Sequence, residues 1–256
     1  MATEDIIVTG GVATAAYVAQ QLFGKTLAEM GDDLNKIYKA NRDKILSNAA
    51  KKVTDPNDGA KPNLRVARDV IWNGAVTDDE VCAEYFGGLL AASRSDYVDC
   101  IKALSSKQLH LHFVIYNSLH KMLVEVGSPI KPGMQDELSQ KQVWFSTNEL
   151  MRLGLNLVID MNVLHRQGLV SSYAMNQHVV GIKALPYSQA SPTTFGVLLY
   201  AAALNYLTSW HQFGNAGFAP IAAEIPLPTL IAPNVDALCK LVGLVDPPLP
   251  QQPPQP

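Results

Sequence analysis

Formal charge is scarce in this sequence. Only 17% of its 256 residues are charged, whereas an ordinary globular chain carries about a quarter. The formal net charge of −3 excludes a strongly basic nucleic-acid coat protein, and the 48% hydrophobic content excludes a disordered charged tail. The mean hydropathy of +0.06 is also far from that of a protein with many membrane spans.

Cysteine is also sparse. The three cysteines, Cys82, Cys100 and Cys239, form no CxxC pair, which predicts reduced thiols in an intracellular protein. The first residues are acidic, whereas a signal peptide begins with positive charge. We therefore expect a cytoplasmic location.

The motifs of common catalytic sites are missing. The start Ile6–Gly11 is similar to a dinucleotide-binding turn, but the glycines that would admit a pyrophosphate do not follow. GxxxxGK[ST], HExxH and GxSxG are absent. His110 and His112, two residues apart on a helix, point to opposite sides and cannot share a metal. We predict a protein that is not an enzyme and holds no cofactor and no metal.

Composition divides the chain into three zones. Ten of the 20 basic residues lie in 25–68, no formal charge occurs in 184–223, and ten of the 16 prolines follow residue 219. The predicted organisation is a helical N-terminal region (1–100), a winged-helix-like domain (101–213) and a proline-rich extended tail (214–256) that is disordered from about residue 246. The predicted fold class is mainly α.

Helix signals are clear in the first zone. Apolar residues repeat every three or four positions over 25–53, and acidic residues at 78–80 predict a helix start. Gly87 and Gly88 lie inside that next helix and predict a close helix crossing, because glycine in a helix otherwise costs about 1 kcal/mol.

The middle zone has the element order of a winged helix. Ser105 and Gln108 form a capping-box pattern, and Gly168 ends a later helix. Strands are predicted over 170–173 and 178–185, separated by 174–177, before a long apolar helix over 195–210.

That order offers DNA binding through a helix over 156–167 as an alternative. The candidate contacts are His165, Arg166, His178 and Lys183. Contacts to DNA phosphates need cations, and these four residues supply few of them. The negative charge of Asp160 on the same helix weakens this hypothesis further. A third alternative is a membrane-acting effector that uses Val12–Phe23 or Phe195–Trp210, although the second segment is shorter than the about 20 residues of a membrane span.

Two segments resemble the bacterial abortive-infection alpha (Abi-alpha) family. They are LFGKTLAEMG (22–31), running on to NRDKI (41–45), and DEVCAEYFGGLLA (79–91). The resemblance covers about 13–213 and rests on packing motifs; Tyr85–Gly88 replaces the family's aromatic-small centre. It implies a role in phage defence and no catalytic residues.

We therefore expect a non-enzymatic protein that acts through contacts with a phage or host protein. The expected interaction surface comprises charged residues of the two front helices: Lys36, Lys39, Arg42, Lys44, Asp78, Asp79, Glu80 and Glu84.

Overall fold

Helices supply most of the structure, and a small antiparallel sheet supplies the rest. The computed structural model describes residues 39–53, 63–74, 79–92, 96–127, 133–218 and 225–244. In chain order the elements are α3 (Lys39–Lys52), α4 (Leu64–Gly74), α5 (Glu80–Ala92), α6 (Val98–Lys102), α7 (Ser106–Val126), α8 (Gln135–Ser139), β1 (Val143–Ser146), α9 (Thr147–Arg152), α10 (Leu157–Arg166), β2 (Val170–Val180), β3 (Lys183–Pro192), α11 (Thr194–Ala203), the 3₁₀ helix η1 (Leu207–Gln212), β4 (Ile231–Ala232) and α12 (Val235–Leu241).

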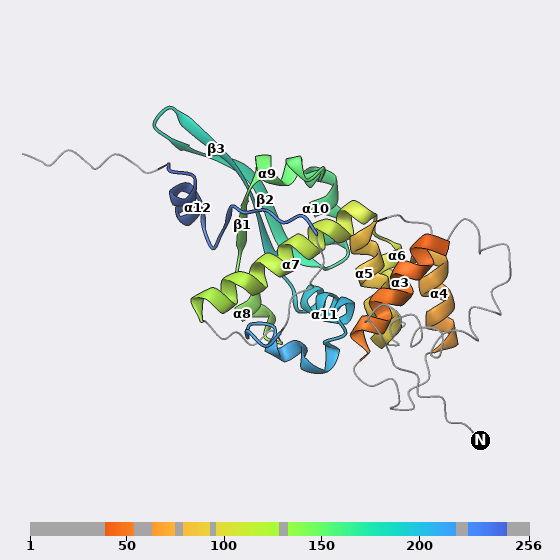
Figure 1. Cartoon of the computed structure of the whole chain (residues 1–256). Coiled ribbons are helices and arrows are strands. Elements are labelled where there is room, and N and C mark those ends of the chain that lie inside the picture. The colour runs from red at the N-terminus through yellow and green to blue at the C-terminus, as the bar shows by residue number, and fades with distance from the viewer. Residues whose placement is uncertain are drawn as a thin grey trace, which may run out of the picture.

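The long helix α7 runs between two groups of elements. The helices α3 to α6 gather at one end of it, α10 lies close to that same end, and the sheet extends towards the other (Figure 1). The predicted capping box is confirmed at its start, because the Ser105 side chain accepts from the backbone of Gln108, whose side chain accepts from the backbone of Ser105. Gly127 ends the helix with a φ of 61°.

The sheet has the strand order β2-β3-β1-β4, and all of its pairs are antiparallel. The prediction of two short strands around 174–177 is wrong. These residues continue β2 in register with β3, and the turn lies at Gly181 and Ile182 instead. The physical reason is that Gly181 takes a φ of 60°, a conformation that suits glycine. The resulting hairpin projects from the body of the molecule (Figure 1).

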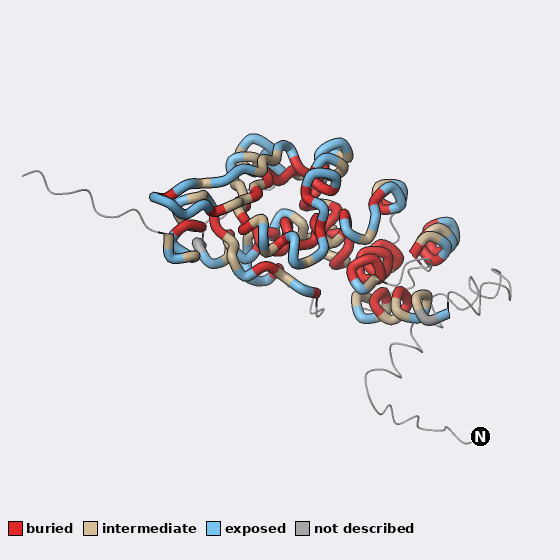
Figure 2. The backbone as a smooth tube through the Cα atoms, turned by 90° about the horizontal axis from the view of Figure 1, so that it is seen from above, coloured by how far each residue is buried: buried red, intermediate tan, exposed pale blue. Residues whose placement is uncertain are grey.

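The two glycines of α5 lie at close helix crossings, as predicted. A Cβ on Gly87 would lie 2.8 Å from the Cβ of Asn48 in α3, and one on Gly88 would overlap the backbone of Ala203 in α11. One continuous cluster of buried apolar residues then joins the front helices to α7, α10, α11 and β1. The cluster therefore contains residues from before and after the predicted domain boundary at residue 100. Figure 2 shows these buried segments along the interior helices, while much of the hairpin is exposed.

Two predicted segments differ from the structure. The apolar helix expected over 195–210 ends at Ala203 and is followed by η1. Asn205, with a φ of 60°, interrupts it, and asparagine is among the residues that best tolerate that conformation.

The extended tail predicted from residue 214 contains β4 and α12 within 225–244, which we call the C-terminal segment. It packs Leu238 and Cys239 in a second, smaller core with Leu185 of the hairpin. The part predicted as disordered, from about residue 246, lies outside the described residues.

Candidate interaction surface

The charged surface predicted on the front helices is largely neutralised by pairing. Lys44 of α3 forms an ion pair with Glu80 of α5 at 3.1 Å, and Arg42 pairs with Asp43 at 3.0 Å. Lys39, the first residue of α3, is exposed. Lys36 and Asp78 lie outside the described residues.

Two acidic residues of that predicted surface have structural roles. Asp79 accepts a hydrogen bond from the backbone of Cys82 at 3.0 Å and so caps α5, as the acidic run predicts. Glu84 is 9% exposed, which corrects its assignment to an interaction surface. It pairs with Lys52 at 2.6 Å, and burial lowers the pKa of that lysine although Glu84 acts to raise it.

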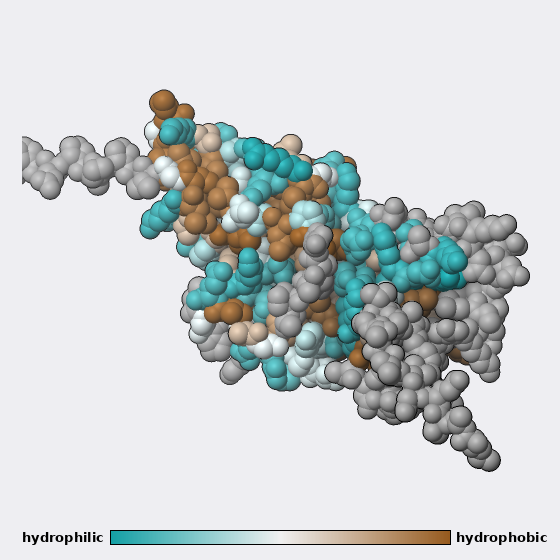
Figure 3. All heavy atoms as spheres, in the orientation of Figure 1, coloured by the Kyte–Doolittle hydropathy of each residue, from teal (hydrophilic) through white to brown (hydrophobic). Residues whose placement is uncertain are grey.

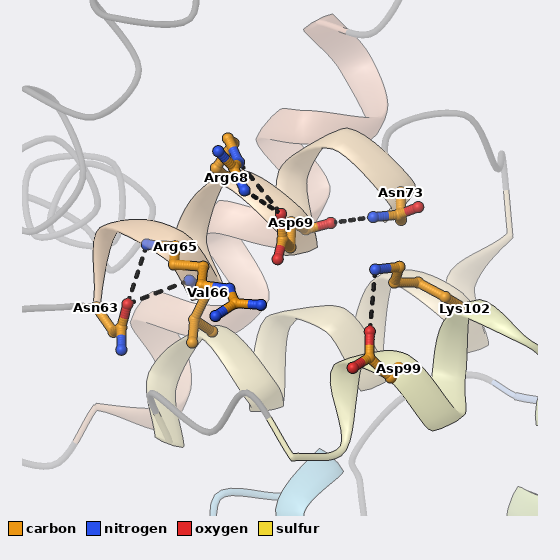
Figure 4. A network of polar contacts seen from close by, with 8 residues as sticks. All are labelled: Asn63, Arg65, Val66, Arg68, Asp69, Asn73, Asp99 and Lys102. Carbon is orange, nitrogen blue, oxygen red and sulfur yellow. Dashed lines mark hydrogen bonds and ion pairs between the residues drawn. The ribbon is translucent and has the colours of Figure 1, made fainter.

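Charges on the neighbouring face of α4 and α6 are also paired locally. Arg68 contacts Asp69 at 3.1 Å, and Lys102 contacts Asp99 at 3.1 Å (Figure 4). The Asn63 side chain caps α4 by accepting from the backbone N–H groups of Arg65 and Val66.

A different surface is made by α9, α10 and the hairpin. On α10 the exposed residues are 158, 159, 162, 165 and 166, which the helical period places on one side. Val158 and Ile159 are large apolar side chains that are 66% and 57% exposed, and Met151 at the end of α9 is 60% exposed. We call Met151, Val158 and Ile159 the α9–α10 apolar patch.

Few cations surround this patch. His165 and Arg166 are exposed on α10, Lys183 is exposed on β3, and His178 is half-buried on β2. From the sequence, the negative charge of Asp160 was expected to offset these cations at the surface. In the structure Asp160 is only 4% exposed. The hairpin itself contains no acidic residue.

Asp160 holds α10 in place from inside. Its carboxylate accepts from the backbone of Asn156 at 2.8 Å and from the side chain of Gln108 in α7 at 3.4 Å. The hydrogen bond to Asn156 satisfies an N–H group at the start of α10, and the one to Gln108 ties that start to α7. The exposed side of the helix is thereby directed away from the core.

A buried tyrosine fixes both ends of the hairpin. The Tyr116 hydroxyl donates to the carbonyl of Leu169 at 2.5 Å and accepts from the backbone of Thr193 at 2.9 Å. Thr193 also donates to the carbonyl of Gly168 at 2.7 Å. Gly196 packs so closely against the Tyr116 hydroxyl that a Cβ there would overlap it.

The C-terminal segment is fastened to α9 by Glu149. Its carboxylate accepts from the backbone and hydroxyl of Thr229, both at 2.7 Å, and from the backbone of Leu230 at 2.9 Å. Burial acts to raise the pKa of Glu149, but these hydrogen bonds outweigh it and the pKa lies below its usual value.

The histidines of α7 have separate partners. His110 contacts the carbonyl of Pro226 at 3.1 Å, whereas Nδ1 of His112 contacts the Tyr85 hydroxyl at 2.5 Å. Burial lowers the pKa of His112 to about 3, so the ring is neutral at pH 7. Among the described residues no group of three or more His, Cys, Asp or Glu side chains could hold a metal ion.

The structure describes only one of the two segments that the sequence offered for membrane contact. Val12–Phe23 lies outside the described residues. In the second segment, α11 covers only Thr194–Ala203, and seven of its ten residues are buried. No helix in the described ranges is both long enough and apolar enough to cross a bilayer.

Comparison with known proteins finds no matching family model, no similar curated protein and no similar solved structure.

Proposed function

We propose that this chain is a non-enzymatic protein-binding module, built on a winged-helix arrangement, whose binding surface is the α9–α10 apolar patch. The arrangement is supported by element order and pairing. A helix, a short strand, two short helices and a hairpin follow one another, and β1 pairs with the second strand of the hairpin. In this reading α10 is the recognition helix and the β2–β3 hairpin is the wing.

The observation that carries the proposal is the exposure of Val158 and Ile159 on α10. A helix that reads DNA presents cations and hydrogen-bonding side chains to phosphates and bases. Exposed apolar side chains grouped on one side of a helix are instead typical of protein interfaces. The recognition helix therefore favours a protein partner.

The resemblance to the Abi-alpha family supplies the biological setting. We place the protein in bacterial phage defence, where it stops an infected cell through contact with a phage or host protein.

Phage restriction tests this proposal with two matched variants. Ile159→Ser removes 57%-exposed apolar surface from α10, and Leu241→Ser removes 56%-exposed apolar surface from α12. In a bacterial host challenged with a broad phage panel, we expect plaquing of some phages to fall with the wild type and with Leu241→Ser but not with Ile159→Ser. Unchanged plaquing with the wild type, or full restriction by Ile159→Ser, would contradict the proposal.

DNA binding is the second candidate because burial of Asp160 leaves no exposed carboxylate on α10 or the hairpin. Gel shifts at low and physiological salt distinguish it. Specific binding that survives physiological salt and weakens in Arg166→Ala and Lys183→Ala would favour this function over the first. Binding that disappears with salt and shows no sequence preference would exclude it.

A further inference from the structure

The strand β2 forms an unprotected edge of the sheet. The opposite edge is the two-residue strand β4, whereas β2 has 11 residues. Exposed edges are normally protected by charge, by proline or by shortness. The sequence of β2, VSSYAMNQHVV, contains no Lys, Arg, Asp, Glu or Pro. This edge therefore has neither the charge nor the proline that protects other edges, and near its start the Tyr173 side chain contacts Asn162 and His165 of α10.

The backbone groups available at this edge follow from the register. Val180 pairs with Lys183 across a two-residue turn, and such a turn is closed by a hydrogen-bonded pair. Because hydrogen-bonded and non-hydrogen-bonded positions alternate, the backbones of Tyr173, Met175, Gln177 and Val179 point away from β3. Among the described backbone–backbone bonds outside the sheet ladders, none uses these four residues. The N–H of Gln177 donates to the side-chain oxygen of its neighbour Asn176 at 2.8 Å, a local bond that a second strand would replace.

The same hairpin carries exposed apolar side chains. Val179 is 58% exposed, and Ile182 at the turn is completely exposed. Figure 3 shows the projecting end of the hairpin as hydrophobic. A projecting end of this kind gains free energy when another surface removes it from water.

We propose that two copies of this chain associate by antiparallel pairing of their β2 strands about a two-fold axis at Asn176. This register places Tyr173 opposite the second copy's Val179, and Met175 opposite its Gln177. A cross-strand pair of an aromatic and a β-branched side chain is favourable. No like charges meet, because β2 has none.

A second copy fits this edge better than an unrelated extended peptide. The two-fold register covers Val179 with the partner copy's Tyr173 and brings Ile182 beside the first residues of the partner copy's β2. Pairing of the two β2 strands thus covers Val179 and Ile182 of one copy, and the two-fold symmetry covers the same two residues of the other copy.

Solution mass is the first test. We expect the full-length wild type to sediment as a dimer over a concentration series. Gln177→Pro removes the outward N–H group that would exchange its bond to the Asn176 side chain for one to the second copy. An edge strand tolerates such a proline, and the change should raise the dimer dissociation constant by about tenfold or more. Gln177→Ala keeps that N–H group and should remain dimeric. A wild type that is monomeric at every concentration, or a Gln177→Pro variant as dimeric as the wild type, would overturn the proposal.

Cross-linking tests the register. At the two-fold axis the two Asn176 Cα atoms would be about 4.5 Å apart, within the range of a disulfide. Under mild oxidation Asn176→Cys should form covalent dimers much faster than Ser172→Cys, whose copies would lie about 26 Å apart. The native cysteines are common to both variants. Equal rates would overturn the pairing. Because neither test uses phage, either result is independent of the defence proposal.

Discussion

Two Lys–Glu pairs join α3 to α5, and they should differ sharply in their effect on stability. In the Lys52–Glu84 pair each side chain is 12% exposed, and the atoms are 2.6 Å apart. In the Lys44–Glu80 pair the side chains are 38% and 63% exposed, at 3.1 Å. The prediction is that Glu84→Gln is much more destabilising than Glu80→Gln.

The magnitude follows from burial. Removing one partner of a buried pair leaves an uncompensated charge and costs about 3–5 kcal/mol, whereas an exposed pair contributes about 0–1 kcal/mol. The Lys52 ammonium also donates to the carbonyls of Glu84 and Ala203, both at 2.8 Å. These bonds remain in Glu84→Gln, so we expect the lower end of the range, about 3 kcal/mol.

Urea titration of the two variants and the wild type measures the free energy of unfolding. The double variant Lys52→Met/Glu84→Met removes both charges and should be more stable than Glu84→Gln alone. Added salt should reduce the effect of Glu80→Gln and leave that of Glu84→Gln nearly unchanged. Losses of similar size in the two single variants would refute this reasoning.

Three further predictions concern the core and the C-terminal segment. Burial lowers the pKa of His112 from 6.5 to about 3, so the folded chain keeps this ring neutral while the unfolded chain binds a proton below pH 6.5. The free energy of unfolding should therefore fall by up to about 1.4 kcal/mol per pH unit as pH drops below 6.5. Urea titrations of His112→Phe should lack this slope. Glu149 has a lowered pKa, so its contribution is present above its ordinary pKa of 4.5 and is lost as pH falls through the folded value; Glu149→Gln should speed hydrogen exchange in the C-terminal segment at pH 7, and unchanged exchange would contradict this. Gly196→Ala would overlap a buried tyrosine hydroxyl and should cost about 1–3 kcal/mol by thermal unfolding, whereas Gly217→Ala, with no atom within 4 Å of the added Cβ, should not.

Local patterns predicted much of the helical structure. The capping box at Ser105 and Gln108, the cap at Asp79 and the close crossings at Gly87 and Gly88 are all present. Each depends on residues close in sequence or on the small size of one residue. Such signals act before distant contacts form, so a single sequence is enough to detect them.

The predictions that failed needed distant partners. Residues 174–177 contain turn-forming types, yet pairing with 186–189 makes them strand. β4 is two residues long and exists through its pairing with β1. Glu84 was expected on a surface together with the other charged residues of the two front helices, but the packing of α3 and α11 around α5 buries it.

The candidate site was predicted only in part. The sequence indicated the helix over 156–167 and its scarcity of cations, and both features are present. It did not indicate which side of that helix faces the core, so Asp160 was counted as exposed and Val158 and Ile159 were not considered. The open edge of β2 could not be found without knowing the strand order.

The sequence by itself determined where several helices begin and that a hairpin follows α10. It also determined how few charged residues α10 and the hairpin carry. These features depend on local chemistry and composition. The tertiary structure alone decided which charges are paired or buried and which apolar side chains remain exposed. Burial depends on contacts between residues far apart in the chain, such as Lys52 with Ala203 and Glu149 with Thr229, and no local pattern records those contacts.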